Sequence, residues 1–286
     1  MIRFFSLRTF APLAVVAAVA VATLATPEGR QLPLPALKDS GEAVYPAFEG
    51  WYQNADGSYN LLLGYYNRNY KQTLNIPVGP NNRVEPGGPD LGQPTYFTPR
   101  RGWGVFAIKV PKDFARDKRY TWTIVANGKP AAVPVGLIPD YQIEPFKDEA
   151  AGNTPPVLKF SPTGKTFSGP PVEIAHTLGG AVAQPVTLEV TTTDDMHTEE
   201  GENPALAGRT PRLVQSWHLH RGPAGGEVTF SEQRPKIGDG GTSTTTATFS
   251  VAGEYLLRAQ ANDNSGEGGG GFQCCWTNAY VKVTIK

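Results

Sequence analysis

The sequence has few residues of the kinds that carry metal, redox or nucleophilic chemistry. Its 286 residues include two cysteines, two methionines and four histidines, and they contain neither a G-x-S-x-G nor an H-E-x-x-H motif. Gly164-Lys165-Thr166 resembles the end of a phosphate-binding loop, but Lys159 stands where the first glycine belongs. Because no nucleophile, base and orienting residue can be assembled from motifs, we expect a protein that is not an enzyme.

Long hydrophobic runs are absent after the amino terminus. Arg3 and Arg8 precede an uncharged run, Ala11–Ala22, and small residues continue to Ala25. This is the three-part pattern of a secretory signal peptide, and the run is shorter than the roughly 20 residues of a spanning helix. We expect residues 1–25 to be removed and the protein to be secreted or periplasmic. The alternative is an uncleaved signal anchor, which is the one predicted route to a membrane.

Neither sign of charge is in excess. The chain has 26 basic and 26 acidic residues, and removal of the signal, with its two arginines, lowers the net charge to −2. Domains that bind nucleic acid and patches that bind anionic lipid are strongly basic. The composition therefore predicts no nucleic-acid partner and no lipid-binding patch.

Glycine and proline are abundant, at 32 and 26 residues, and both end helices and form turns. Short runs of β-branched, aromatic and other apolar residues alternate with these turns, which is typical of an antiparallel sandwich. The sequence predicts an all-β protein with two antiparallel β-sandwich modules. The predicted segments are the signal peptide (1–25), a flexible lead (26–43), the first module (44–146), a linker (147–155) and the second module (156–286).

Strands of the first module are expected in AFEGWYQN, SYNLLLGYY, TLNIPV, TYFTP, GWGVFAIKVP and RYTWTIVANG. Asp56-Gly57 and Asn127-Gly128 predict hairpin turns. The glycine- and proline-rich stretch between Pro77 and Pro99 is expected to be a long loop. Strands of the second module are expected in VTLEVTTT, LVQSWHLH, EVTF, TTTATFS, EYLLRAQAND and AYVKVTIK.

The second module also carries a resemblance. SWHLHRGPAGGEVTF (216–230) and TTTATFSVAGEYLLRAQANDNSG (244–266) resemble the polycystic-kidney-disease-type Ig-like repeats of extracellular proteins. The resemblance implies an Ig-like sandwich with Trp217 in its core. The first module, in DGSYNLLLGYYNRNYKQTLNIPVGPNNRVEPGGPDLGQPTYFTP, looks like a repeat of secreted bacterial surface proteins of unknown function. That likeness implies no activity.

Cys274 and Cys275 are adjacent in the sequence. Neighbouring α-carbons lie about 3.8 Å apart, below the usual disulfide range of about 4.4–6.8 Å. A bond between them would be strained; the alternatives are two thiols, a metal-bound pair or a cross-link to another chain. His218 and His220 lie two residues apart on a predicted strand, so they share the face opposite Trp217. We expect that face to be exposed, which would make the pair half of a metal site.

One end of the predicted Ig-like sandwich collects two loops. The first carries Met196 and His197, and the second leads to Cys274 and Cys275, so these residues are candidate ligands of copper or zinc. Carboxylates on the same loops are candidate ligands of calcium. The acidic members of this end are Asp194, Asp195, Glu199, Glu200, Asp263 and Glu267. A solvated acidic loop is the simpler alternative, and no cofactor is required.

The first module offers Tyr65, Tyr66 and Tyr70 as a candidate aromatic surface, because aromatic faces stack on sugars and polymers. We expect an exported recognition, adhesion or structural protein, with an extracellular protein or a polysaccharide as partner. The alternatives are a metal-binding exported protein that uses the loop end of the second module and an accessory carbohydrate-binding protein.

Overall fold

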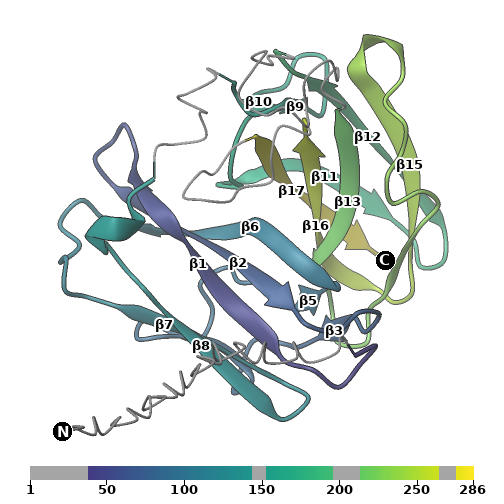
Figure 1. The fold of residues 1–286 in the computed structure, drawn as a ribbon. Coiled ribbons are helices and arrows are strands. Elements are labelled where there is room, and N and C mark those ends of the chain that lie inside the picture. The colour runs from purple at the N-terminus through teal and green to yellow at the C-terminus, as the bar shows by residue number, and fades with distance from the viewer. Residues whose placement is uncertain (1–37, 144–152, 196–212, 264–274) are drawn as a thin grey trace, which may run out of the picture. The chain divides into compact units, whose positions relative to one another are not determined.

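A computed structural model describes residues 38–143, 153–195, 213–263 and 275–286. In the first module, β1 (Val44–Gln53), β2 (Tyr59–Asn67) and β6 (Arg100–Val110) form an antiparallel sheet in the order β1-β2-β6 (Figure 1). The predicted turn at Asp56-Gly57 joins β1 to β2. Gly57 has φ +82°, and Asp56 Oδ1 accepts a hydrogen bond of 3.0 Å from the Ser58 amide. The turn forms because glycine adopts positive φ without steric cost.

A second sheet closes the first module. It consists of β4 (Asn82–Glu85), β7 (Tyr120–Ala126) and β8 (Lys129–Val135), in the order β4-β7-β8. A two-stranded pair, β3 (Leu74–Asn75) and β5 (Tyr96–Phe97), and the short 3-10 helix η1 (Pro139–Tyr141) complete the module. The two larger sheets enclose a core that includes Trp51, Leu61, Leu63, Phe106 and Trp122.

The second module is also a pair of sheets. The five-stranded sheet contains β10 (Thr166–Phe167), β9 (Val157–Lys159), β12 (Pro185–Thr193), β15 (Thr242–Phe249) and β14 (Val228–Phe230), in that order. The four-stranded sheet contains β11 (Ile174–Gly180), β17 (Trp276–Ile285), β16 (Gly253–Asn262) and β13 (Val214–Arg221), in that order. The 3-10 helix η2 (Asp239–Gly241) precedes β15.

The prediction of an all-β protein built of antiparallel sheets is confirmed, with two differences in detail. The stretch between Pro77 and Pro99 is not one loop, because β4 lies within it and pairs with β7. The sequence reading missed β9, β10 and β11, and β11 pairs with β17 in parallel. Trp217 lies in the second core, as predicted, and is 1% exposed.

The sheet β1-β2-β6 is buried on both faces. Successive side chains alternate between the faces of a strand, so Leu61 and Leu63 enter the first core while Leu62 points away from it. Leu62 belongs instead to a small cluster with Tyr52, Ile143 and Trp276, and Trp276 lies on β17 of the second module. The two modules therefore meet through this face, and residues 37–286 form one compact unit. Within the described residues, no helix has the length and apolar character needed to cross a bilayer.

Candidate functional site

The contacts between the outer face of sheet β1-β2-β6 and the sheet containing β17 are called the junction here. At its centre, the Trp276 indole occupies the space in which a Cβ of Gly104 would lie. Asn278 Nδ2 donates to the carbonyl oxygens of Trp103 and Gly104, both at 3.2 Å, and the Tyr280 hydroxyl donates to Val105 O at 2.8 Å. Only glycine at position 104 allows β6 and β17 to approach this closely.

A buried carboxylate lies beside this contact. Glu49, on β1, is 8% exposed, and its Oε2 accepts a 2.8 Å hydrogen bond from the Gly104 amide. Arg101 Nη2 lies 2.8 Å from Oε1 in an ion pair. The carboxylate fits because Gly64, on the neighbouring strand, has no side chain in its place. Burial raises the pKa of Glu49 to about 7, although Arg101 and the Gly104 amide favour the charged form.

A second buried charge lies across the junction on β16. Arg258 is 4% exposed, and its Nη1 donates to Asn278 Oδ1 at 2.6 Å. Burial lowers the pKa of Arg258, although the guanidinium is charged at any physiological pH. Its electrostatic partners include Glu49, so one carboxylate faces the guanidinium groups of both Arg101 and Arg258.

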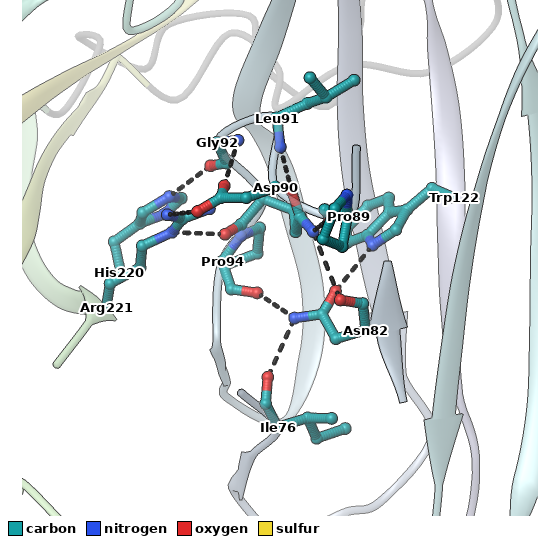
Figure 2. Close-up of polar contacts among 11 residues, drawn as sticks. Ile76, Asn82, Pro89, Asp90, Leu91, Gly92, Pro94, Trp122, His220 and Arg221 are labelled. Carbon is teal, nitrogen blue, oxygen red and sulfur yellow. Dashed lines mark hydrogen bonds and ion pairs between the residues drawn. The ribbon is translucent and has the colours of Figure 1, made fainter. Parts of the chain in front are cut away.

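The loop between β4 and β5 is held from the second module (Figure 2). Arg221, on β13, makes a two-pronged ion pair with Asp90, at 2.7 and 3.0 Å, and its Nε donates to Gln93 O at 2.7 Å. The pKa of Asp90 is lowered, chiefly by its hydrogen bond with Arg221. Planar two-pronged pairs of this kind fix orientation as well as distance. The loop therefore has a defined position against the second module.

His220 makes a further contact with the same loop. Its Nε2 lies 3.0 Å from Gly92 O, and the Thr95 amide donates to the backbone oxygen of His220 at 3.0 Å. Since a carbonyl can only accept, we assign the proton to Nε2. His220 is 2% exposed, and burial lowers its pKa to about 3, so the ring is neutral at physiological pH.

The other side of the loop is fixed within the first module. Asn82 is fully buried; its Nδ2 donates to Ile76 O at 2.9 Å and Pro94 O at 2.8 Å, and its Oδ1 accepts from Trp122 Nε1 at 3.0 Å. Figure 2 shows Asn82 and Trp122 on one side of the loop and the His220–Arg221 pair on the other. The loop links the first core to the second module, although its sequence predicts only turns.

A groove of about 600 Å³ opens between the modules beside the junction. The first module contributes Arg100, Arg101 and Trp103, and the second contributes His218, Arg234 and Gln260. Arg101 stacks on Trp103 with its guanidinium carbon 4.0 Å from the ring centroid. The groove has the size of a ligand site and lies between two fixed walls.

The prediction for His218 and His220 is correct about the face that they share and wrong about the exposure of that face. His218 and His220 share the face opposite Trp217, as expected, but that face is not free in solution. It packs against the first module, so His220 is buried and His218 lies at the inner wall of the groove. The expectation of an exposed pair was wrong because the sequence pattern shows which face a residue takes but not what covers it. No three His, Cys, Asp or Glu side chains group as metal ligands among the described residues.

Part of the predicted acidic end can be located. Thr154 donates to Asp195 Oδ2 through its amide at 3.1 Å and its hydroxyl at 2.6 Å, and Asn153 Nδ2 donates to Asp263 Oδ2 at 2.8 Å. Adjacent residues thus bring Asp195 and Asp263 to the same end of the module, where the Asp263 amide also donates to Cys275 O. Cys275 is disulfide-bonded.

Asp194 is among the described residues. The other predicted ligands and acidic residues at this end of the second module lie outside the described residues. They are Met196, His197, Glu199, Glu200, Glu267 and Cys274.

Of the three tyrosines of the predicted aromatic surface, one is exposed, one is partly buried and one is buried. Tyr65 is 2% exposed and belongs to the first core, whereas Tyr70 is 55% exposed and Tyr66 is partly buried. Tyr65 follows the alternation of β2 into the core with Leu61 and Leu63. The Arg100 guanidinium lies 5.9 Å from the Tyr66 ring centroid and 5.8 Å from that of Tyr70.

The sequence reading missed the most unusual residues of the junction. The sequence offered one signal for Glu49, which is a charged residue within the aromatic strand AFEGWYQN. A charge in such a strand requires a partner if it is buried. Arg258, within EYLLRAQAND, carried the same signal. Neither strand indicated that the other module would cover its charge.

No family model matches the sequence, and no curated protein matches it. Among solved structures, the D0-D1 domain of intimin aligns over 85% of this chain and 97% of its own, at 12% identity and a TM-score of 0.25. Domains 4 and 5 of the S-layer protein SbsC align over 85% and 98%, at 12% identity and a TM-score of 0.23. A tandem pair of titin Ig domains aligns over 86% and 99%, at 12% identity and a TM-score of 0.22. Scores this low carry no argument, so the fold rests on the strand order given above.

Proposed function

We propose that this chain is an exported, non-catalytic recognition or structural protein that acts as one stiff unit, with the groove between its modules as the binding surface. The observation that carries the proposal is the junction. Strongly shifted pKa values often mark catalytic groups. Here Glu49 is held by Arg101 and Gly104 within the first module, and His220 is held across the junction by Gly92, so both shifted groups have structural partners.

The groove supports recognition because its walls cannot move independently. One wall begins at Arg100 on β6 and the other is formed by β13 and β16, and the junction connects these strands. A site formed in advance loses little conformational entropy when a ligand binds. An extracellular protein or a polysaccharide is the expected partner, since the amino-terminal pattern predicts export. Sequencing of the exported protein from Thr26 would support cleavage, and recovery of intact Met1 in a membrane fraction would contradict it.

The experiment compares two substitutions that add the same side chain. Gln233→Trp fills the groove without a change of charge, whereas Thr187→Trp adds a tryptophan to an exposed position of β12 outside it. Purified full chains are tested for retention on cell-envelope material from the producing organism. We expect the wild type and Thr187→Trp to be retained equally and Gln233→Trp to lose retention, with the bound material recovered chemically unchanged. Equal retention of both variants, or chemical conversion of the bound material, would overturn the proposal.

Metal binding at the loop end of the second module is a second proposal, with Ca, Cu or Zn as the ion. It is supported by the placement of Asp195 and Asp263 at one end of the module. Elemental analysis of purified protein with and without Asp263→Asn tests it directly. A metal content near zero in the wild type would remove this alternative and leave the groove proposal intact.

A further inference from the structure

The charge of the groove is unbalanced. Arg100, Arg101 and Arg234 line it, Arg258 lies behind it, and none of its lining residues, all of them described, is acidic. The carboxylate of Glu49, beside the groove residue Arg101, is already engaged by that residue. Arg100 and Arg234 form no ion pair with any described residue. Clefts lined by one sign of charge concentrate ligands of the opposite sign.

Arg100 is held in a conformation that costs free energy. Its φ is +76°, a region that side chains other than glycine seldom adopt, and such strain is concentrated at functional sites. Its guanidinium lies over Tyr66 and Tyr70, and contacts of this kind keep a cation in place. The surrounding structure therefore directs a charged side chain to the rim of the groove.

The inner wall carries polar atoms that are not fully used. His218 Nε2 lies 3.1 Å from Ser216 Oγ, Nδ1 is buried, and the Gln260 side chain interacts with the same ring. Burial, together with Arg258 and Arg234, lowers the pKa of His218, so the neutral ring offers both a donor and an acceptor. Gln260 and Thr98 add an amide and a hydroxyl to the lining. This set can bind hydroxyl groups, which also both donate and accept.

Aliphatic side chains are scarce in the groove. Val214 and Pro99 are the aliphatic lining residues, and the Trp103 ring already stacks on Arg101. An acidic peptide would need pockets for its side chains, which this lining does not provide. A polyhydroxylated anion matches both the arginines and the neutral polar groups.

We propose that the groove binds acidic polysaccharide, with Arg100 and Arg234 pairing with its carboxylate or sulfate groups and the His218 wall hydrogen-bonding its hydroxyls. This inference rests on the proposed function and specifies its ligand. The guanidinium group forms two parallel hydrogen bonds with an oxyanion, which gives geometric selectivity as well as affinity.

The experiment is calorimetric titration of the full chain with matched probes. Oligogalacturonide is compared with its neutral methyl ester, and dextran sulfate with neutral dextran, so that each pair differs only in the anionic group. Polyglutamate serves as the acidic peptide. We expect at least one acidic polysaccharide to bind, and its neutral partner to bind at least about tenfold more weakly, since one charge-assisted hydrogen bond contributes about that factor. The pair that responds distinguishes a carboxylate from a sulfate source.

Variants locate the site. Arg100→Asn keeps a residue that tolerates positive φ, and Arg234→Gln removes a charge from an exposed residue. Each should weaken binding about tenfold, whereas Arg116→Gln, an exposed arginine outside the groove, should leave it unchanged. Equal binding of charged and neutral sugars, equal binding of polyglutamate, equal losses in all three variants, or no binding of any probe would overturn the inference. The retention assay with Gln233→Trp would still decide the proposed function, because it presupposes no ligand class.

Discussion

The core of the second module and the junction are both buried, but they differ in chemistry. The core packs Trp217, Leu257, Val281 and their neighbours with few polar groups. The junction places Glu49 and Arg258 out of water and satisfies them with an amide, a guanidinium and Asn278. An apolar core accepts any well-packed arrangement, whereas buried charges accept only one in which every partner is in place. We infer that the core supplies stability and that the junction fixes the relative position of the modules.

The largest expected effect on the free energy of unfolding tests the role given to the core of the second module. Trp217→Ala removes a fully buried indole and should lower the free energy of unfolding by about 3–5 kcal/mol. Denaturant unfolding of the full chain measures it, with Tyr141→Ala, at a position 46% exposed, as the control. A stable Trp217→Ala variant would contradict the importance given to this core.

The second prediction tests the junction. Glu49→Ala leaves the charge of Arg101 without its partner and should cost about 3 kcal/mol. Both partners of Glu49 lie in the first module, so the loss should fall on that module and on the face that meets the second. The double variant Glu49→Leu, Arg101→Leu removes both charges and should recover most of the lost stability. If the double variant is no better than the single one, the cost does not come from an unpaired charge.

The elements of the two cores could be predicted from the sequence, and the junction could not. The alternation in LVQSWHLH places Trp217 on one face and both histidines on the other. The same pattern cannot show that His220 would meet Gly92, 128 residues earlier in the chain. Periodicity reports the two faces of one strand, whereas a junction depends on which faces of separate sheets meet. The short strands β9 and β10 were missed because two or three residues hold too little pattern to detect.

A third prediction uses pH. The pKa of buried His220 is lowered to about 3 from 6.5, so its contribution to stability is fully present above pH 6.5 and is lost as the pH falls towards 3. At pH 5 this loss amounts to about 2 kcal/mol. Glu49 acts in the opposite direction, because a raised pKa gives stability that is present below pH 4.5 and lost as the pH rises through about 7.

His220→Gln separates these two effects, because its amide can still donate to Gly92 O. Between pH 7 and pH 5, the free energy of unfolding of the variant should improve by about 2 kcal/mol relative to the wild type. Parallel curves for the two proteins would mean that His220 is not shielded from water as the structure indicates.

The smallest expected effect on stability concerns the Arg221–Asp90 ion pair, which holds the loop between β4 and β5 against the second module. Asp90 is half-exposed, so Asp90→Ala should cost no more than about 1 kcal/mol, and less at high salt. Its effect on the angle between the modules should be larger than its effect on stability, and small-angle scattering of the full chain measures that angle. Glu254→Ala, which breaks the exposed pair with Lys282 on the second module, is the matched control. Identical scattering from the two variants would show that the Arg221–Asp90 pair does not fix the angle.

The position of β17 has a consequence for the order in which the chain can assemble. This strand lies between β11 and β16, and it supplies Trp276 to Gly104 of the first module. It also follows every other described strand in the chain. The first module must therefore wait with Leu62 and Tyr52 uncovered until residues 276–285 arrive. Closure of the junction thus depends on β17, because the apolar face of sheet β1-β2-β6 is covered only when Trp276 packs against it.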